Sequence, residues 1–115
     1  MAVAYKILGQ IQPSANVLTN VYSVPVGSNT IINTIAICNF GNSNAIVDFA
    51  VRPDTEALAN KHYIIKTLTI PPADSFLYSP GITLAAKSVV VANNVSTNNF
   101  IGTNVAFSVF GVEIS

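Results

Sequence analysis

The residues best suited to chemistry are few, and they begin with His62, the only histidine, which lies between Lys61 and Tyr63. Nucleophilic catalysis needs a nucleophile, a general base and a group that orients the base. No such set surrounds His62 in the sequence, and a histidine at the start of a strand beside a loop is more often structural. We therefore predict that its side chain hydrogen-bonds the connection formed by residues 54–60.

The acidic residues are the next candidates: Asp48, Asp54, Glu56, Asp74 and Glu113. Glycoside hydrolysis needs two carboxylates across a cleft, and nothing in this spacing brings two together. One histidine and one cysteine form no zinc-binding pattern, and an oxygen-only calcium site needs acids that are more closely clustered. We predict no enzymatic activity, no metal and no cofactor.

Four charged or titratable side chains are expected to form a structural polar cluster. Asp48 and Arg52 fall on one face of an alternating run, and Lys66 falls on the next predicted strand. Either of the first two could pair with the other or with Lys66, and His62 completes the set. Solvated surface charge is the default for these groups, so the cluster should contribute less than about 1 kcal/mol where it is exposed.

Composition favours a protein that works in contact with others. The 115 residues suffice for one domain, residues 1–115, in which 50% are hydrophobic and 9% are charged. Ordinary soluble domains carry roughly 25% charged residues. The net charge of zero offers no attraction for nucleic acid and little repulsion between copies. We expect association with itself or a partner; the alternative is a monomer with Asn, Ser and Thr on its outer faces.

Sequence features that the chain lacks narrow the class of protein further. No run supplies the ~20 apolar residues of a membrane helix, and the amino terminus lacks the pattern of a cleaved secretion signal. The single cysteine, Cys38, excludes an internal disulfide and is expected to pack as a small apolar residue inside a strand. We expect no membrane partner and no nucleic acid.

Alternation of polar and apolar residues predicts short strands separated by turns. Residues 31–40 are mostly apolar on both faces and should form a central strand, and the turns at residues 26–29 and 41–44 should close hairpins. Asn93 and Asn94 are expected in an exposed loop. About eight strands and no substantial helix predict an all-β fold, an antiparallel β-sandwich or jelly roll. The expected strands cover residues 5–8, 17–24, 31–40, 45–51, 62–70, 75–78, 82–84, 88–92 and 104–114.

Two places could contact a neighbour. Residues 1–16, with Tyr5 and Ile7, could form an arm or an edge strand that adds to another subunit. Phe100 and Ile101, between Asn99 and Gly102, could form an exposed apolar tip. For this pair, a side chain that folds back on the core is an equal alternative.

Four stretches of the chain resemble a family of small virion structural proteins of tailed bacteriophages, including phages of cyanobacteria. These are AVRP at 50–53, ALANKHYI at 57–64, GITL at 81–84 and FGVEI at 110–114. The resemblance covers nearly the whole chain, although the Asn-rich stretch 93–104 departs from the pattern. It implies a non-enzymatic, β-rich subunit of the virion, assembled in the host cytoplasm, with no catalytic residues to carry over.

Three functions are open at this point. The first is an accessory subunit that forms a symmetric homo-oligomer and binds other virion proteins on the tail, neck or fibre. The second is a capsid decoration, or cement, protein bound to the major capsid protein. The third is a carbohydrate-binding module for a host surface glycan, which the absence of Trp and of an aromatic row disfavours.

Overall fold

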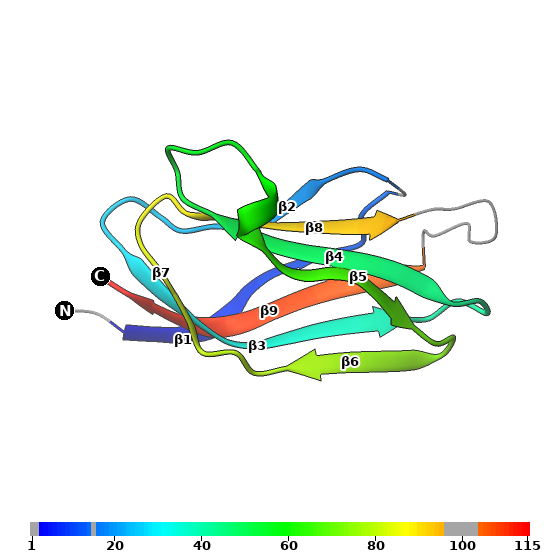
Figure 1. Ribbon diagram of the computed structural model, residues 1–115. Coiled ribbons are helices and arrows are strands. Elements are labelled where there is room, and N and C mark those ends of the chain that lie inside the picture. Colours follow the sequence, from blue (N-terminus) through cyan, green and yellow to red (C-terminus); the bar gives the residue numbers. More distant parts are fainter. Residues whose placement is uncertain (1–2, 15, 96–103) are drawn as a thin grey trace.

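The protein is an all-β sandwich. The computed structural model describes residues 3–14, 16–95 and 104–115. In these residues the chain forms two antiparallel sheets packed against each other and one turn of 3-10 helix, η1 (Asn60–His62) (Figure 1). The strands are β1 (Val3–Ile11), β2 (Thr19–Ser23), β3 (Asn29–Asn39), β4 (Ala45–Arg52), β5 (Tyr63–Ile70), β6 (Asp74–Tyr78), β7 (Ile82–Leu84), β8 (Val89–Val95) and β9 (Val105–Ile114).

The strand order is that of a jelly roll. One sheet has the order β1-β9-β3-β6, with β7 also paired to β3, and we call it the five-stranded sheet. The other, the four-stranded sheet, has the order β2-β8-β4-β5. The chain passes back and forth between the sheets, so strands that follow one another mostly lie in opposite layers. The predicted fold class is therefore confirmed.

The two predicted hairpins are wrong. The turns at residues 25–28 and 41–44 carry the chain from one sheet to the other, because β2 and β4 lie in the four-stranded sheet and β3 lies in the five-stranded sheet. Gly and Asn allow the chain to reverse direction in a tight turn. They do not decide whether the next strand pairs with the previous one in the same sheet or packs against it in the other sheet. Here β3 and β4 each have a buried face, and these faces pack against each other.

The core lies between the inner faces of the two sheets. Its fully buried side chains come from β3, β4, β8 and β9, and they include Ile32, Ile35, Ile37, Val47, Phe49, Val90, Val105, Phe107 and Val109. In β3 the register shifts between Ile32 and Thr34, so Ile32 and Ile35 both face inward despite their odd spacing. Beyond the shift, Cys38 faces outward and is exposed, contrary to its predicted apolar packing.

Strand β1 is longer than the predicted strand at residues 5–8, which was expected to stop before Gly9. The register with β9 shifts between Ile7 and Gly9, and β1 continues to Ile11. A Cβ atom at Gly9 would lie 2.3 Å from the carbonyl oxygen of Val21 on β2. Only glycine allows this approach, which closes one side of the sandwich between β1 and β2. The straight part of β1, residues 3–7, is thereby left as a free edge among the described residues.

The predicted exposed loop at Asn93 and Asn94 is also a strand. Both residues belong to β8, where Asn93 is half-buried and Asn94 is fully buried. The backbone carbonyl of Asn94 accepts a hydrogen bond of 2.7 Å from the backbone N–H of Asn16. Asparagine is uncommon in strands, so its propensity misled the prediction.

Candidate functional site

The connection between β4 and β5, residues 53–62, covers the outer face of the four-stranded sheet. Ala50, Val89 and Val91 point outward from β4 and β8 and form a second buried apolar cluster. Leu58 of the connection and Tyr63 pack against this cluster. The chain therefore covers the apolar outer face of this sheet with a segment of its own (Figure 1).

His62 and Glu56 hold this connection in place. The His62 side chain is buried, with 7% of the residue exposed, and its Nδ1 accepts a hydrogen bond of 2.9 Å from the Ala59 N–H. Its Nε2 lies 3.3 Å from a carboxylate oxygen of Glu56, which also accepts from Lys61 at 2.6 Å. Both ring nitrogens of His62 thus have partners within the connection, as a structural role requires.

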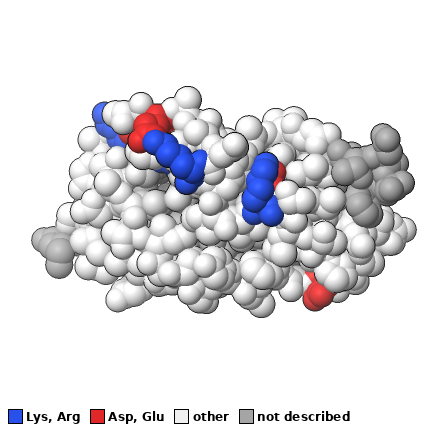
Figure 2. All heavy atoms as spheres, viewed as in Figure 1, with Lys and Arg blue, Asp and Glu red and all other residues white. Residues whose placement is uncertain are grey.

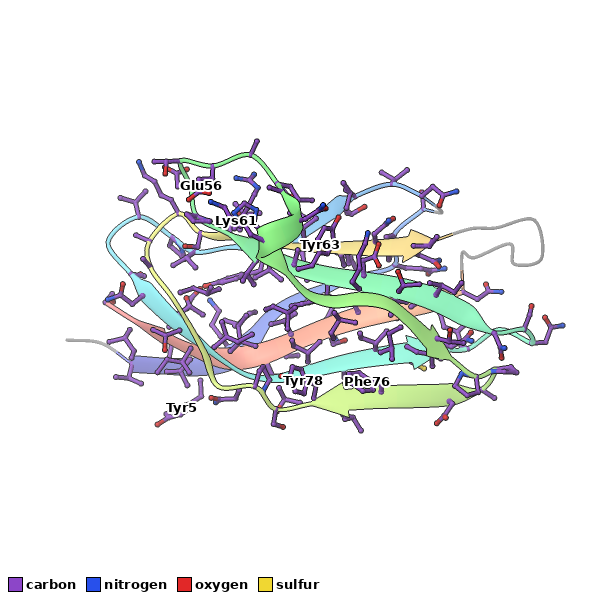
Figure 3. The ribbon with its side chains drawn as sticks, in the orientation of Figure 1. Tyr5, Glu56, Lys61, Tyr63, Phe76 and Tyr78 are labelled. Atoms are coloured by element: carbon purple, nitrogen blue, oxygen red, sulfur yellow. The ribbon has the colours of Figure 1, made fainter. Side chains whose placement is uncertain are left out.

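The Lys61 ammonium also changes the electrostatics of Glu56. Its hydrogen bond and its charge lower the pKa of the Glu56 carboxyl, and His62 adds a smaller effect in the same direction. Figure 3 shows the Glu56 and Lys61 side chains close together above the four-stranded sheet. The Arg52 guanidinium donates to the backbone carbonyl of Glu56 at 3.1 Å, so it supports the same segment.

Asp48 lies apart from Arg52 and His62. It points into β5, where its carboxylate lies 3.3 Å from the Lys66 ammonium and accepts the Thr67 N–H at 2.8 Å. Only 2% of Asp48 is exposed, which differs from the solvated charge that we expected. The four residues of the predicted polar cluster therefore form two groups: Asp48 with Lys66, and Arg52 and His62 with the connection.

An open depression of about 490 Å³ lies between this connection and the four-stranded sheet. Its walls include Leu18, Asn20, Arg52 and Asp54. The lining has no aromatic ring on which a sugar could stack, and the guanidinium of Arg52 already donates to backbone carbonyls. The depression therefore lacks the aromatic platform that a carbohydrate-binding site would use.

A second polar network joins the two sheets at one end of the sandwich. The Tyr22 hydroxyl of β2 donates to the Glu113 carboxylate of β9 and lies 2.8 Å from the Thr30 hydroxyl. Lys6 of β1 donates to the other Glu113 oxygen at 2.8 Å. Burial, with help from Glu113, raises the pKa of Tyr22 to about 12, and the Lys6 hydrogen bond is the main cause that lowers the pKa of Glu113. These groups link strands and point to no substrate.

The outer face of the five-stranded sheet is different, because no segment of the described chain covers it. The cross-strand pairs of β1, β9, β3, β6 and β7 place one set of side chains on this face, which we call the uncharged face. It consists of Val3, Tyr5, Ile7, Gln10, Asn29, Ile31, Thr34, Ala36, Cys38, Ser75, Leu77, Thr83, Ala106, Ser108, Phe110, Val112 and Ile114. None of these residues carries a charge.

Large apolar side chains on this face are open to solvent. Tyr5 is 80% exposed, Leu77 is 69% exposed and Ile7 is 53% exposed. Tyr5 points out from β1 below the sheet in Figure 3. In Figure 2 the charged atoms gather over the upper part of the view, and the lower part is white apart from an acidic side chain near its edge.

Two of the four predicted contact residues, Tyr5 and Ile7, lie on the uncharged face. Phe100 and Ile101 lie outside the described residues. Sequence reasoning missed the remaining members of the face, since it predicted residues 104–114 as a strand without assigning its outward side chains to a contact surface. The available signal was the apolar character of both faces of β9, which carries Phe107 and Val109 inward and Phe110 and Val112 outward.

Comparisons with known proteins give no family assignment: no protein-family model matches the chain, and no curated protein matches it. Within the described residues, no group of three metal-ligating side chains lies close enough to hold an ion. The same residues include no helix with the length and apolar character to cross a membrane.

Proposed function

We propose that the protein is a non-enzymatic structural protein of a bacteriophage virion, an accessory subunit that forms a symmetric homo-oligomer on the tail, neck or a fibre. The uncharged face is the observation that supports this proposal most. An apolar, uncharged sheet face with Tyr5 and Leu77 exposed has the composition of a contact surface, because charged residues are depleted where proteins meet.

The fold and the sequence support the same class by analogy. Jelly rolls build many viral capsid domains, and four stretches of this chain resemble virion proteins of tailed phages. The polar groups that sequence reasoning weighed for catalysis, His62 and Glu56, are partnered within the β4–β5 connection. This arrangement suits a rigid building block.

A capsid decoration protein is the alternative within this class. The same face would then rest on the major capsid protein and stabilise neighbouring capsomers. A lectin-like role also has fold analogy, since lectin domains share the jelly roll. No observation favours it, because the open depression beside Arg52 has no aromatic lining.

The test is a density map of purified phage particles, with mass spectrometry to measure copy number. We expect the chain in fixed stoichiometry, as jelly-roll density on the tail, neck or a fibre. Density on the capsid shell would favour the decoration protein. A chain that is made during infection but absent from purified particles would overturn the proposal.

A further inference from the structure

We infer that the partner of the uncharged face is a second copy of this chain, with the two faces packed against each other about a two-fold axis. The inference rests on the proposed function, which requires a homo-oligomer, and it adds the surface, the partner and the symmetry. A two-fold interface uses the same patch on both subunits, so the patch must be compatible with itself.

The two sheets differ in how their outer faces are covered. Both have apolar side chains on their outer faces, but the four-stranded sheet buries Ala50, Val89 and Val91 under its own connection. The five-stranded sheet has no such cover in the described residues. Its outer face therefore still has apolar area that a second subunit can bury.

The lack of charge on this face also favours a second copy as the partner. When a charged patch meets its own copy, like charges approach each other, and this costs free energy. The described residues of the uncharged face carry no charge, so the face can meet itself without this cost. One pair of charges near it is neutralised within the subunit, because Lys6 donates to Glu113 at 2.8 Å on the other side of the sheet. A single acidic residue, Asp74, lies beside the face at the start of β6. A strongly charged partner would find nothing complementary on this face.

The area of the uncharged face is close to what a stable dimer needs. The strands β1, β9, β3, β6 and β7 contain 9, 10, 11, 5 and 3 residues. At ~3.4 Å per residue and ~4.8 Å between strands, they give a projected area of roughly 620 Å². A standard interface buries about 800 Å² of accessible surface on each partner. A corrugated sheet face has more accessible surface than its projection, so this face is large enough for a stable dimer.

The position of the apolar side chains gives the centre of the contact. Across the sheet, Tyr5 lies opposite Val112, which lies opposite Ile31, and Ile31 lies opposite Thr83. The neighbouring row contains Ile7, opposite Phe110. Within these rows Val112 is only 7% exposed, so Tyr5 and Ile7 offer most of the apolar surface. The contact should therefore begin at these rows and extend along β3 to Leu77 and Cys38, so that it covers the whole face.

Two threonines allow a matched test. Thr83 lies on the uncharged face and Thr69 lies on the outer face of the four-stranded sheet; both are exposed strand residues. We would make Thr83→Lys and Thr69→Lys and measure mass by light scattering between 1 and ~200 μM, with thermal unfolding to confirm the fold. The wild type and Thr69→Lys should be dimers at the upper concentrations. Thr83→Lys should weaken dimerisation at least tenfold.

Cys38 supplies an independent readout, since it is exposed on the uncharged face of the free subunit. Its reaction with a maleimide should slow as the dimer forms, and Thr83→Lys should restore the rate. If Thr83→Lys does not fold, Tyr5→Lys serves instead, because that side chain is 80% exposed.

A wild-type monomer at 200 μM would overturn the inference, as would a dimer that resists both substitutions on this face. These results are separate from the test of function. A monomeric chain found in purified particles would contradict the second copy as partner, and with it the homo-oligomer, but would leave the virion role standing. A dimer that depends on Thr83 but is absent from particles would contradict only the virion role.

Discussion

The carboxylate of Asp48 on β4 accepts a hydrogen bond of 2.8 Å from the backbone N–H of Thr67 on β5. The register between the two strands shifts here, so that Lys66 and Thr67 together lie opposite Asp48. Such a β-bulge removes a backbone group from the regular ladder. The buried carboxylate supplies the acceptor that the ladder no longer provides, and it also lies 3.4 Å from the side-chain amide nitrogen of Asn93.

Replacing Asp48 with Ala should therefore lower the free energy of unfolding by about 2–3 kcal/mol, because the part-buried Thr67 N–H loses a charged acceptor. Urea unfolding monitored by circular dichroism measures the change. Lys66→Ala is the control: that side chain is largely exposed, and its loss should cost less than about 1 kcal/mol. Equal losses for the two variants would show that the ion pair, and not the backbone hydrogen bond, carries the stability.

Thr67 itself adopts a strained backbone, with a φ of 58° that is rare for a β-branched residue. Asparagine tolerates this left-handed region better, so Thr67→Asn should raise the free energy of unfolding by about 1 kcal/mol, the lower end of such strain. The same exchange at Thr69, two residues along β5, should lower stability because β-branched residues favour strands. A decrease for both variants would contradict the strain at Thr67.

The fold class was predictable because alternation along the strands records which side chains face the core. The sheet to which each strand belongs was not. The turn at residues 41–44 is equally compatible with a hairpin and with the observed crossing from β3 to β4, and only the packing of both inner faces decides between them. Bulges add to the difficulty, since the shift beside Asn33 changes the face of every later residue in β3.

The candidate sites also include some features that the sequence predicts and others that it does not. The partners of His62 were predictable in kind, since they lie within six residues along the chain. The burial of Asp48 was not, because it depends on a bulge in a different strand. The uncharged face combines residues from five strands, and its members are known only once the strand order is known. Tyr5 and Ile7 were predicted as contact residues only because they lie in an amino-terminal arm or edge strand, and the strand pairing places both on this face.

The protein should become less stable in acid, partly because the Glu113 carboxylate becomes protonated. Its pKa is lowered in the folded protein, first by the hydrogen bond from Lys6 and then by that from Tyr22. A lowered pKa contributes stability above the ordinary value of 4.5, and this contribution is lost as the pH falls through the folded value. The wild type should therefore be more stable than Glu113→Gln near neutral pH, and this difference should shrink as the pH falls below 5. Thermal unfolding of both proteins at a series of pH values measures it.

Tyr22→Phe separates the two causes. This variant keeps Lys6, the larger cause, so its stability should still depend on Glu113 ionisation in acid. A difference between wild type and Glu113→Gln that does not change from pH 7 to pH 3 would mean that the Glu113 contribution does not come from its charge.

Replacing His62 with Ala should lower the free energy of unfolding by about 1–3 kcal/mol, because the Ala59 N–H loses its acceptor and the connection loses a buried ring. Lys61→Ala should change stability much less, since that side chain is exposed and its ion pair with Glu56 lies at the surface. Chemical unfolding of both variants measures the difference.

Self-association and attachment to particles should be unchanged in a folded His62→Ala variant, because His62 supports the cover of the four-stranded sheet and the uncharged face belongs to the other sheet. Light scattering at 4 °C, where the variant stays folded, tests this separation. A folded variant that no longer associates would assign the contact to the connection at residues 53–62. The connection would then have to move away from Ala50, Val89 and Val91 in the assembly, since Leu58 packs over those residues in the free subunit.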